Sequence, residues 1–318
     1  MRIVNRNLCT LLLGVLAMSL GASALTIKVD CSGADRTASK TIAAALVLAP
    51  KFLPTTIAVS GTCNENVMID SFDRLTIQGN PTATIIGNGD PSLFATVNIE
   101  NSQYVTMRHL NVSVGGGVSC GRSSCILDHV TVQNSGNDGF DAFQGSDVQI
   151  IDSVIDSSAG SGVFGAASRI FIFGSTIQNS VNWAVRANLG SIVQLSSDAS
   201  GPTRIQNNQD VGVQMEFGSS VVLNGVQVTG NSGDGVNVIR GSNARILNST
   251  VSGNGGNGVR IGDNSFALFQ PTDVLIGNYG ALSVVCDPKN STTRNLFLVS
   301  GITNPGTTNC AAELPVAP

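Results

Sequence analysis

Charged and aromatic side chains are scarce in this sequence. Asp, Glu, Lys and Arg make up 12% of its 318 residues, and Phe, Trp and Tyr make up 5%, with a single tryptophan. The 17 basic residues are outnumbered by 21 acidic ones, which gives a net charge of -4. Such a chain has no excess of cations to neutralise phosphates, so we expect no nucleic-acid partner.

Long apolar runs are also scarce, and the one candidate lies near the N-terminus. Arg2 and Arg6 precede the apolar run Leu11–Met18, and the small residues Ala22-Ser23-Ala24 follow it. This order predicts a secretory signal over residues 1–24, and hence a secreted or periplasmic protein. A membrane anchor is the alternative, but the run is far shorter than the about 20 residues that span a bilayer, so we expect no stable membrane insertion. Without these residues the net charge becomes -6, from 15 basic and 21 acidic residues.

A short motif, Gly or Ala followed by an apolar residue, recurs at a nearly constant distance. It begins at residues 117, 139, 162, 184, 212, 235, 258 and 280, with intervals of 22, 23, 22, 28, 23, 23 and 22. The long interval contains an insertion at 196–203, and two weaker copies lie near Asn66 and Ala95. A fixed short period predicts a solenoid, because one unit cannot bury its apolar face alone. The LxxLxLxxN pattern of leucine-rich repeats is absent.

Within each unit, apolar residues alternate in short runs between Gly, Asn, Ser and Asp. Val236 and Val238 form one such pair, and Val259 and Ile261 form the equivalent pair one unit later. Alternation of this kind predicts β-strands, and no long helical pattern intervenes. We therefore predict an all-β protein, a parallel β-helix of about ten coils.

The ends of the mature chain depart from the repeat. Residues 37–49 predict a helix that ends before Pro50 and covers the open end of the stack. The sequence after residue 285 loses the repeat and gains prolines. We therefore expect one domain over 25–318, with an N-terminal cap (25–55), coils (56–285) and a C-terminal cap and tail (286–318).

Six cysteines remain beyond the signal, and they form three local pairs. Six cysteines allow many connectivities, but proximity and the need to reinforce the ends of a solenoid favour three disulfides. Zinc binding is the alternative, which the lack of a CxxC motif disfavours. The expected pairs are Cys31 with Cys63, Cys120 with Cys125, and Cys286 with Cys310.

The repeat pattern NxGxxGVxI...N(S/T)xV resembles that of the right-handed parallel β-helix superfamily, which includes pectate lyases and polygalacturonases. The resemblance covers roughly residues 56–285. It implies that substrate lies in a groove on the first sheet, which contains the GVxI strands. The outward residues of these strands would then decide the chemistry.

If the apolar residue of each motif points inward, the next residue points into this groove. The middle of the face then gathers carboxylates, aromatic rings and an arginine, a combination suited to the hydroxyl groups and C–H faces of sugars. We expect Asp138, Asp141 and Arg186 to be catalytic and exposed in the groove, and we expect Phe143, Phe164, Trp183 and Glu216 to contact substrate. Asp138 and Asp141 are candidates for an acid/base pair of the glycosidase kind. Arg186 is a candidate to neutralise a uronate or to act as a base.

Other interpretations of the same residues remain open. Asp138 and Asp141, with Asn137, are also candidates to hold a calcium ion, and no other cofactor is expected. Asp and Asn beside Gly are ordinary turn residues, and an exposed Arg is often solvated surface. The NTD, DD, GHG and RxK motifs of polygalacturonases and the DPHE motif of mannuronan epimerases are not reproduced here. All four lysines lie outside the central coils, which excludes a lysine-based lyase mechanism.

Two histidines, His109 and His129, occupy equivalent positions in neighbouring coils. Such a pair is a candidate metal or acid/base site, but turn residues at this corner of later coils favour a structural ladder.

Two functions therefore compete. The first is a secreted protein that binds or cleaves a polysaccharide or cell-envelope glycan along the first sheet. The second is a non-catalytic envelope or surface scaffold or adhesive protein.

Overall fold

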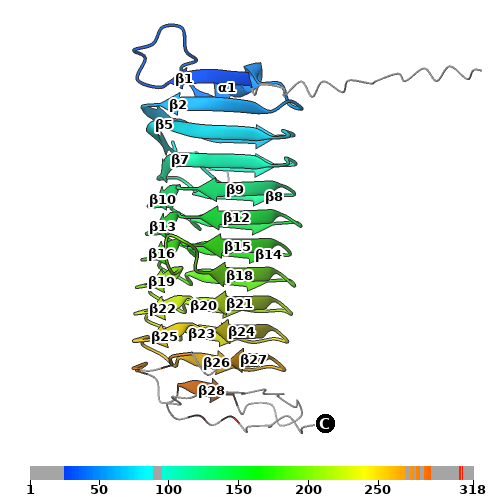
Figure 1. The fold of residues 1–318 in the computed structure, drawn as a ribbon, viewed down its shortest axis with the longest axis vertical. Coiled ribbons are helices and arrows are strands. Elements are labelled where there is room, and N and C mark those ends of the chain that lie inside the picture. Colours follow the sequence, from blue (N-terminus) through cyan, green and yellow to red (C-terminus); the bar gives the residue numbers. More distant parts are fainter. Residues whose placement is uncertain are drawn as a thin grey trace, which may run out of the picture.

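The computed structural model describes residues 25–88, 95–269, 273–275, 277–279, 283–287, 308 and 310. The predicted signal (1–24) and most of the predicted C-terminal tail lie outside these residues. The described chain forms a rod of stacked coils, as Figure 1 shows. All strand pairings along the rod are parallel, so the predicted parallel solenoid is confirmed.

One wall of the rod is a ten-stranded sheet, here called sheet B. It holds the GVxI motifs, one strand for each of the about ten coils that the repeat predicts. Its strands are β4 (Val67–Asp70), β6 (Val97–Glu100), β8 (Val118–Gly121), β11 (Phe140–Phe143), β14 (Val163–Ala166), β17 (Val185–Asn188), β20 (Val213–Met215), β23 (Val236–Val238), β26 (Val259–Ile261) and β28 (Val284–Cys286). The predicted copy at Gly280-Ala281 lies outside the described residues, and Val284 is the residue that pairs with Val259.

The other 18 strands of the described residues form a second sheet, which supplies two walls. β5 and β7 run through both walls, which joins them. The second wall contains β1 (Leu25–Asp30), β2 (Thr55–Ser60), β5 (Leu75–Ile86), β7 (Val105–Ser113), β9 (Ser124–Asp128), β12 (Asp147–Ile151), β15 (Arg169–Phe173), β18 (Ile192–Ser196), β21 (Ser220–Asn224), β24 (Asn243–Leu247) and β27 (Phe266–Phe269). The third wall adds β3 (Thr62–Asn64), β10 (Thr131–Gln133), β13 (Val154–Asp156), β16 (Thr176–Gln178), β19 (Arg204–Gln206), β22 (Gln227–Thr229) and β25 (Thr250–Ser252).

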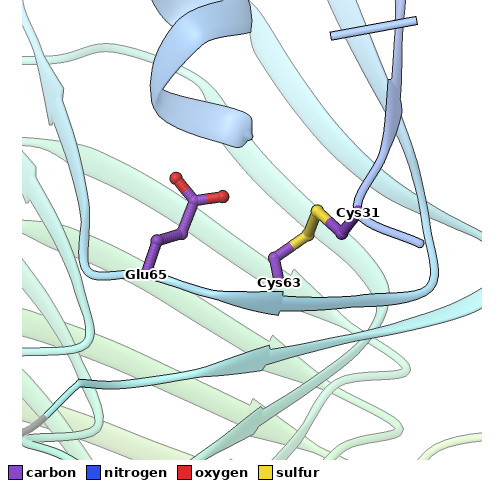
Figure 2. Close-up of side chains that lie close together, drawn as sticks. All are labelled: Cys31, Cys63 and Glu65. Carbon is purple, nitrogen blue, oxygen red and sulfur yellow. A yellow bond between two sulfur atoms is a disulfide. The ribbon is translucent and has the colours of Figure 1, made fainter. Parts of the chain in front are cut away.

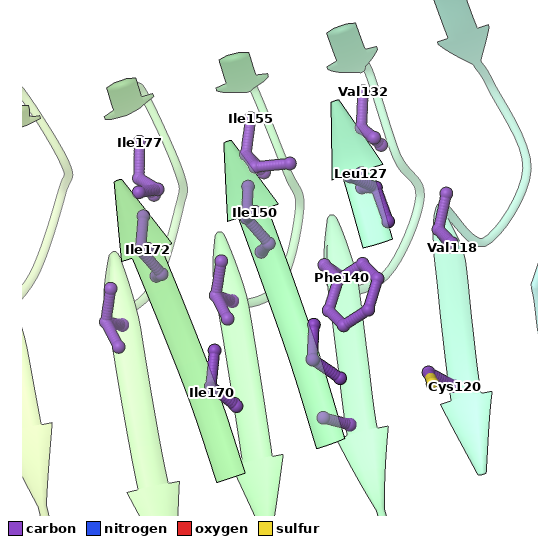
Figure 3. Close-up of a cluster of buried hydrophobic side chains, with 14 of the residues drawn as sticks. Val118, Cys120, Leu127, Val132, Phe140, Ile150, Ile155, Ile170, Ile172 and Ile177 are labelled. Carbon is purple, nitrogen blue, oxygen red and sulfur yellow. The ribbon is translucent and has the colours of Figure 1, made fainter. Parts of the chain in front are cut away.

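The core is a set of apolar columns, because identical positions of successive coils stack in register. Leu127, Ile150 and Ile172 occupy one register position of β9, β12 and β15, and each is fully buried. Figure 3 shows these side chains pointing into the rod beside Phe140. Since side chains alternate along a strand, each inward apolar residue leaves its neighbour on the outer face.

Polar ladders support the corners between the walls. In one, Asn208, Asn231 and Asn254 are buried, and each side-chain amide reaches the next at 2.8–2.9 Å. In another, the hydroxyl of a buried serine accepts the backbone N–H of the serine one coil earlier, as with Ser123 Oγ and Ser102 N–H at 2.9 Å. Such ladders satisfy backbone groups that the turns would otherwise leave unpaired.

The corner that holds His109 and His129 is also built of stacked turn residues. Both have left-handed backbone (φ 52° and 54°), as do Asp152 and Asn248 at the same corner. The two imidazole rings lie 5.2 Å apart, and Arg108 donates to Asp128 across the coils at 2.7 Å. This geometry is that of the structural ladder we expected.

The N-terminal end is covered by helix α1 (Ile42–Leu48), shorter than the predicted 37–49. Thr41 caps the helix through Ala44 N–H, and the carboxylate of Glu65 accepts the N–H groups of Ile42 and Ala43 at 2.7 and 3.0 Å. Figure 2 shows Glu65 beside the Cys31–Cys63 disulfide. The cap also contributes its own strand, since β1 pairs with β2 in parallel.

All three predicted disulfides are present, with Cα–Cα distances of 5.1, 6.5 and 5.2 Å in chain order. Cys31, Cys63 and Glu65 are close enough to resemble a metal site. The sulfur atoms are bonded to each other and Glu65 caps α1, so these groups already have partners. Within the described ranges, no helix is long and apolar enough to cross a membrane.

Candidate functional site

The outer face of sheet B carries the residues that the sequence singled out. Strand register places five residues of successive coils in one outward column: Ser119, Asp141, Phe164, Arg186 and Gln214. This column is the one predicted from the alternation of the GVxI motifs. Trp183 lies just before β17, and Glu216 lies just after β20.

Asp141 has the most strongly shifted pKa of this face. Asp141 occupies an outward position of β11, but it is only 1% exposed. The expectation of an exposed groove carboxylate is therefore wrong. Neither carboxyl oxygen has a hydrogen-bond partner in the described chain. Burial, and then the nearby carboxylate of Asp138, raise the pKa of Asp141 to about 8. Asp141 therefore keeps its proton at neutral pH while ordinary carboxyl groups have lost theirs.

Asp138 is held by the next coil. Its carboxylate accepts the backbone N–H of Ser161. Gly160 makes room for this contact, because a Cβ there would lie 2.3 Å from an Asp138 oxygen. Asp138 and Asp141 thus form a pair in which one carboxyl group is anchored and the other is buried. For calcium, which prefers six to eight oxygen ligands, the pair would supply two carboxylates.

Ser119 is a member of this group that the sequence analysis did not single out. It is fully buried, it is the register neighbour of Asp141 on β8, and its hydroxyl oxygen has no partner among the described residues. Its column position was the only available signal. The Ser119 hydroxyl and the Asp141 carboxyl group therefore lie on neighbouring strands, and neither accepts a hydrogen bond from the described chain.

Arg186 is surrounded by the predicted aromatic residues. Its guanidinium carbon lies 4.3 Å from the centroid of Trp183 and 5.7 Å from that of Phe164. Both rings are partly exposed. Cations within about 6 Å of a ring centroid are attracted to its face. The structure thus brings these three residues together as expected.

Glu216 faces arginines and is 6% exposed. It accepts from Arg186 Nη2 at 3.2 Å and from Gln214 Nε2 at 2.9 Å, and Arg240 Nη1 lies 3.5 Å away. Arg240 in turn lies over the exposed ring of Phe217, 4.6 Å from its centroid. Arg240 and Phe217 were missed because they occupy left-handed turn positions beyond the alternating strands.

Phe143 lies in a neighbouring column, two residues beyond Asp141 on β11. Register places it between Gly121 and Ala166. A Cβ on Gly121 would lie 2.6 Å from the Phe143 ring and from a carboxylate oxygen of Glu100. The ring therefore leans over Gly121, toward the coil that precedes Asp141.

The comparisons with known proteins concern the fold. Residues 202–297 match a family model described as a right handed beta helix region. The A-module of mannuronan C-5 epimerase AlgE4 from Azotobacter vinelandii is similar with a TM-score of 0.53 and 11% identity, over 81% of this chain and 89% of that one. Pectate lyase Pel9A gives a TM-score of 0.50 and 13% identity, over 94% and 82%. No curated protein matches the sequence.

The fold therefore defines the class: the chain is a right-handed parallel β-helix. At 11% and 13% identity, these two solved structures show similarity of fold alone.

Proposed function

We propose that the protein binds a polysaccharide along the outer face of sheet B and cleaves it there with Asp141 and Asp138. The observation that carries this proposal is Asp141 itself, a buried outward carboxyl group with a raised pKa, near Asp138. Phe164 and then Arg186 follow it in the column. Strongly perturbed carboxyl groups on a ligand-binding face are candidates for acid/base catalysis. The similar solved structures are named as a mannuronan epimerase and a pectate lyase, which agrees with a polysaccharide ligand.

The binding surface is the aromatic cluster of Trp183, Phe164 and Arg186. Aromatic rings offer apolar faces to the C–H faces of sugars, and the guanidinium group donates hydrogen bonds to hydroxyls. Coils repeat about every 4.8 Å, so residues from β11 to β17 span roughly 10 Å along the rod. This length suits about two linked sugar rings.

The chemistry we assign is hydrolysis. Asp141 donates its proton to the glycosidic oxygen as the bond to the anomeric carbon breaks. A water molecule adds its hydroxyl to that carbon, and Asp138 accepts the remaining proton of the water. Since Asp141 is covered in the free protein, the neighbouring side chains must move aside when glycan binds. Arg186 is a poor base for a lyase reaction, because it is paired with Glu216.

The proposed function agrees with an exported protein. Three disulfides staple the rod, and such bonds persist in oxidising compartments. We therefore assign the protein to the periplasm or the cell exterior.

The test is a panel of purified polysaccharides incubated with the mature protein, with and without calcium. Binding is measured by titration, hydrolysis by new reducing ends, and elimination by absorbance of unsaturated products. We expect binding and reducing ends, and we expect the Asp141→Asn variant to bind without releasing products. Binding by the wild type without any product would contradict the catalytic half and favour the non-catalytic scaffold. Absence of binding to every glycan would contradict the whole proposal.

A further inference from the structure

Each arginine of the sheet B face already has a carboxylate partner within the described chain. Arg186 and Arg240 share Glu216, at 3.2 and 3.5 Å. Toward the N-terminal end Arg122 pairs with Glu100 at 2.8 Å, and toward the other end Arg260 pairs with Asp287 at 2.8 Å. Every arginine of this face therefore has a carboxylate within 4.0 Å before any ligand arrives, and two of the arginines share one carboxylate.

The same face contains further carboxyl groups. Asp138 lies two residues before β11, and Asp234 occupies the equivalent position before β23, 3.9 Å from Arg260. An anionic sugar on this face would meet these carboxylates, and it would compete with Glu216, Glu100 and Asp287 for the arginines. Recognition of a carboxylate normally relies on a guanidinium group that is free to form paired hydrogen bonds with it.

What the face offers instead is a column of unpartnered polar atoms. Buried oxygen or nitrogen atoms without a partner in the described chain occur on outward residues of five strands of sheet B. Five of these residues, Asn98, Ser119, Asp141, Arg186 and Asn237, lie on five different strands, and a sixth, Asn188, lies in the neighbouring column of Phe143. Strand register puts all five into one column, together with Phe164 and Gln214.

This column is unusual because buried polar atoms in folded proteins are nearly always hydrogen-bonded. Its members include amide and hydroxyl oxygens as acceptors and the Arg186 Nε–H as a donor. At about 4.8 Å per coil, it extends roughly 29 Å from Asn98 to Asn237. A row of mixed donors and acceptors of this length matches the hydroxyl groups along several linked sugars.

We propose that the glycan bound by sheet B is a neutral polysaccharide and not a polyuronate. This inference rests on the proposed function, and it follows from the paired arginines and the column of unpartnered polar atoms. Hydroxyl groups both donate and accept, so they can satisfy the column without introducing charge. A uronate would add an anion to a face where each arginine already contacts a carboxylate.

The test compares neutral and acidic glycans on the same protein. The neutral probes are xylan, galactan, glucomannan and dextran, and the acidic probes are polygalacturonate and alginate. We expect at least one neutral probe to bind at least tenfold more tightly than either acid. Its affinity should stay unchanged when salt is raised from about 0.05 to about 0.5 M, because no net ion pairing is screened. Tighter binding of an acidic probe overturns the inference and leaves the proposed function standing, whereas binding of no probe removes both.

A charge variant gives a second, independent readout. Glu216→Gln leaves Arg186 and Arg240 without their carboxylate, so we expect polygalacturonate binding to rise at least fivefold and to become sensitive to salt. If Glu216→Gln fails to fold, Glu100→Gln repeats the test. Glu100 is less buried than Glu216, and its substitution releases Arg122. The matched control is Asp147→Asn, which releases Arg169 from a 2.6 Å ion pair on the second wall. An equal rise in the control, or no rise in either sheet B variant, contradicts the inference.

Discussion

The guanidinium group of Arg186 lies over the indole ring of Trp183, with 4.3 Å between the guanidinium carbon and the ring centroid. The same guanidinium group donates to Glu216, which directly follows β20 on the next coil. The ion pair therefore fixes Arg186 against the only tryptophan of the chain. This arrangement makes Trp183 a preorganised platform, which loses little side-chain entropy when a ligand binds.

Trp183→Ala should weaken binding of the glycan identified by the panel by more than about 1 kcal/mol, the scale of a lost aromatic contact. Titration calorimetry measures this change. The matched control is Phe171→Ala, which removes an aromatic ring that stacks on Phe173 on the second wall, 6.5 Å between centroids. Equal losses in the two variants would mean that Trp183 has no special part in binding.

Much of this architecture could be predicted because a solenoid repeats its constraints. The first residue of each sheet B strand points inward and is apolar, so the period of the motif reveals the coil. Strict alternation then places Asp141, Phe164 and Arg186 on the same outer face. The disulfide pairs follow from proximity for a similar reason, since neighbours in sequence stay neighbours in the stack.

The state of individual side chains could not be predicted in this way. Asp141 is buried although it points outward, because its exposure depends on side chains of adjacent coils and not on its own strand. Arg240 and Phe217 lie on turns, where no alternation applies. The pairing of Glu216 with two arginines joins residues that are 24 to 30 positions apart in sequence.

Asp141→Asn should change how stability depends on pH. The folded protein holds the Asp141 proton up to pH about 8, whereas the unfolded chain releases it near the ordinary value of 3.8. Between these values the folded state binds one more proton, so wild-type stability falls as pH rises, by at most about 1.4 kcal/mol per pH unit. Asn lacks this titration, so the variant should match the wild type near pH 4 and exceed it by several kcal/mol near pH 9.

Urea unfolding at several pH values measures this difference. The matched control is Asp147→Asn, whose carboxylate is 39% exposed on the second wall. Its stability should stay within about 0.5 kcal/mol of the wild type at each pH. Parallel pH profiles for the wild type and Asp141→Asn would show that Asp141 is ionised in the folded protein.

Asn231→Ala should destabilise the rod by roughly 2–3 kcal/mol. Asn231 is 1% exposed, accepts from the backbone and side chain of Asn208, and donates to Asn254 and to the carbonyl of Ile205. Alanine leaves these buried groups without partners, and the loss passes along the ladder in both directions. Chemical denaturation measures the effect. Asn224→Ala, in an exposed pair with Asn248, serves as control and should change stability by less than about 0.5 kcal/mol.

Glu65→Ala should loosen the N-terminal cap. The carboxylate accepts two backbone N–H groups of the first turn of α1, which no helical carbonyl can reach. Losing these hydrogen bonds should cost about 1–2 kcal/mol, the usual scale for a helix cap. Hydrogen exchange should locate the change, with faster exchange at Ile42 and Ala43 and unchanged rates in the central coils. Asp73→Ala, which removes only an exposed ion pair with Arg74, is the control. Unchanged exchange at Ile42 and Ala43 would show that Thr41 alone is sufficient to cap α1.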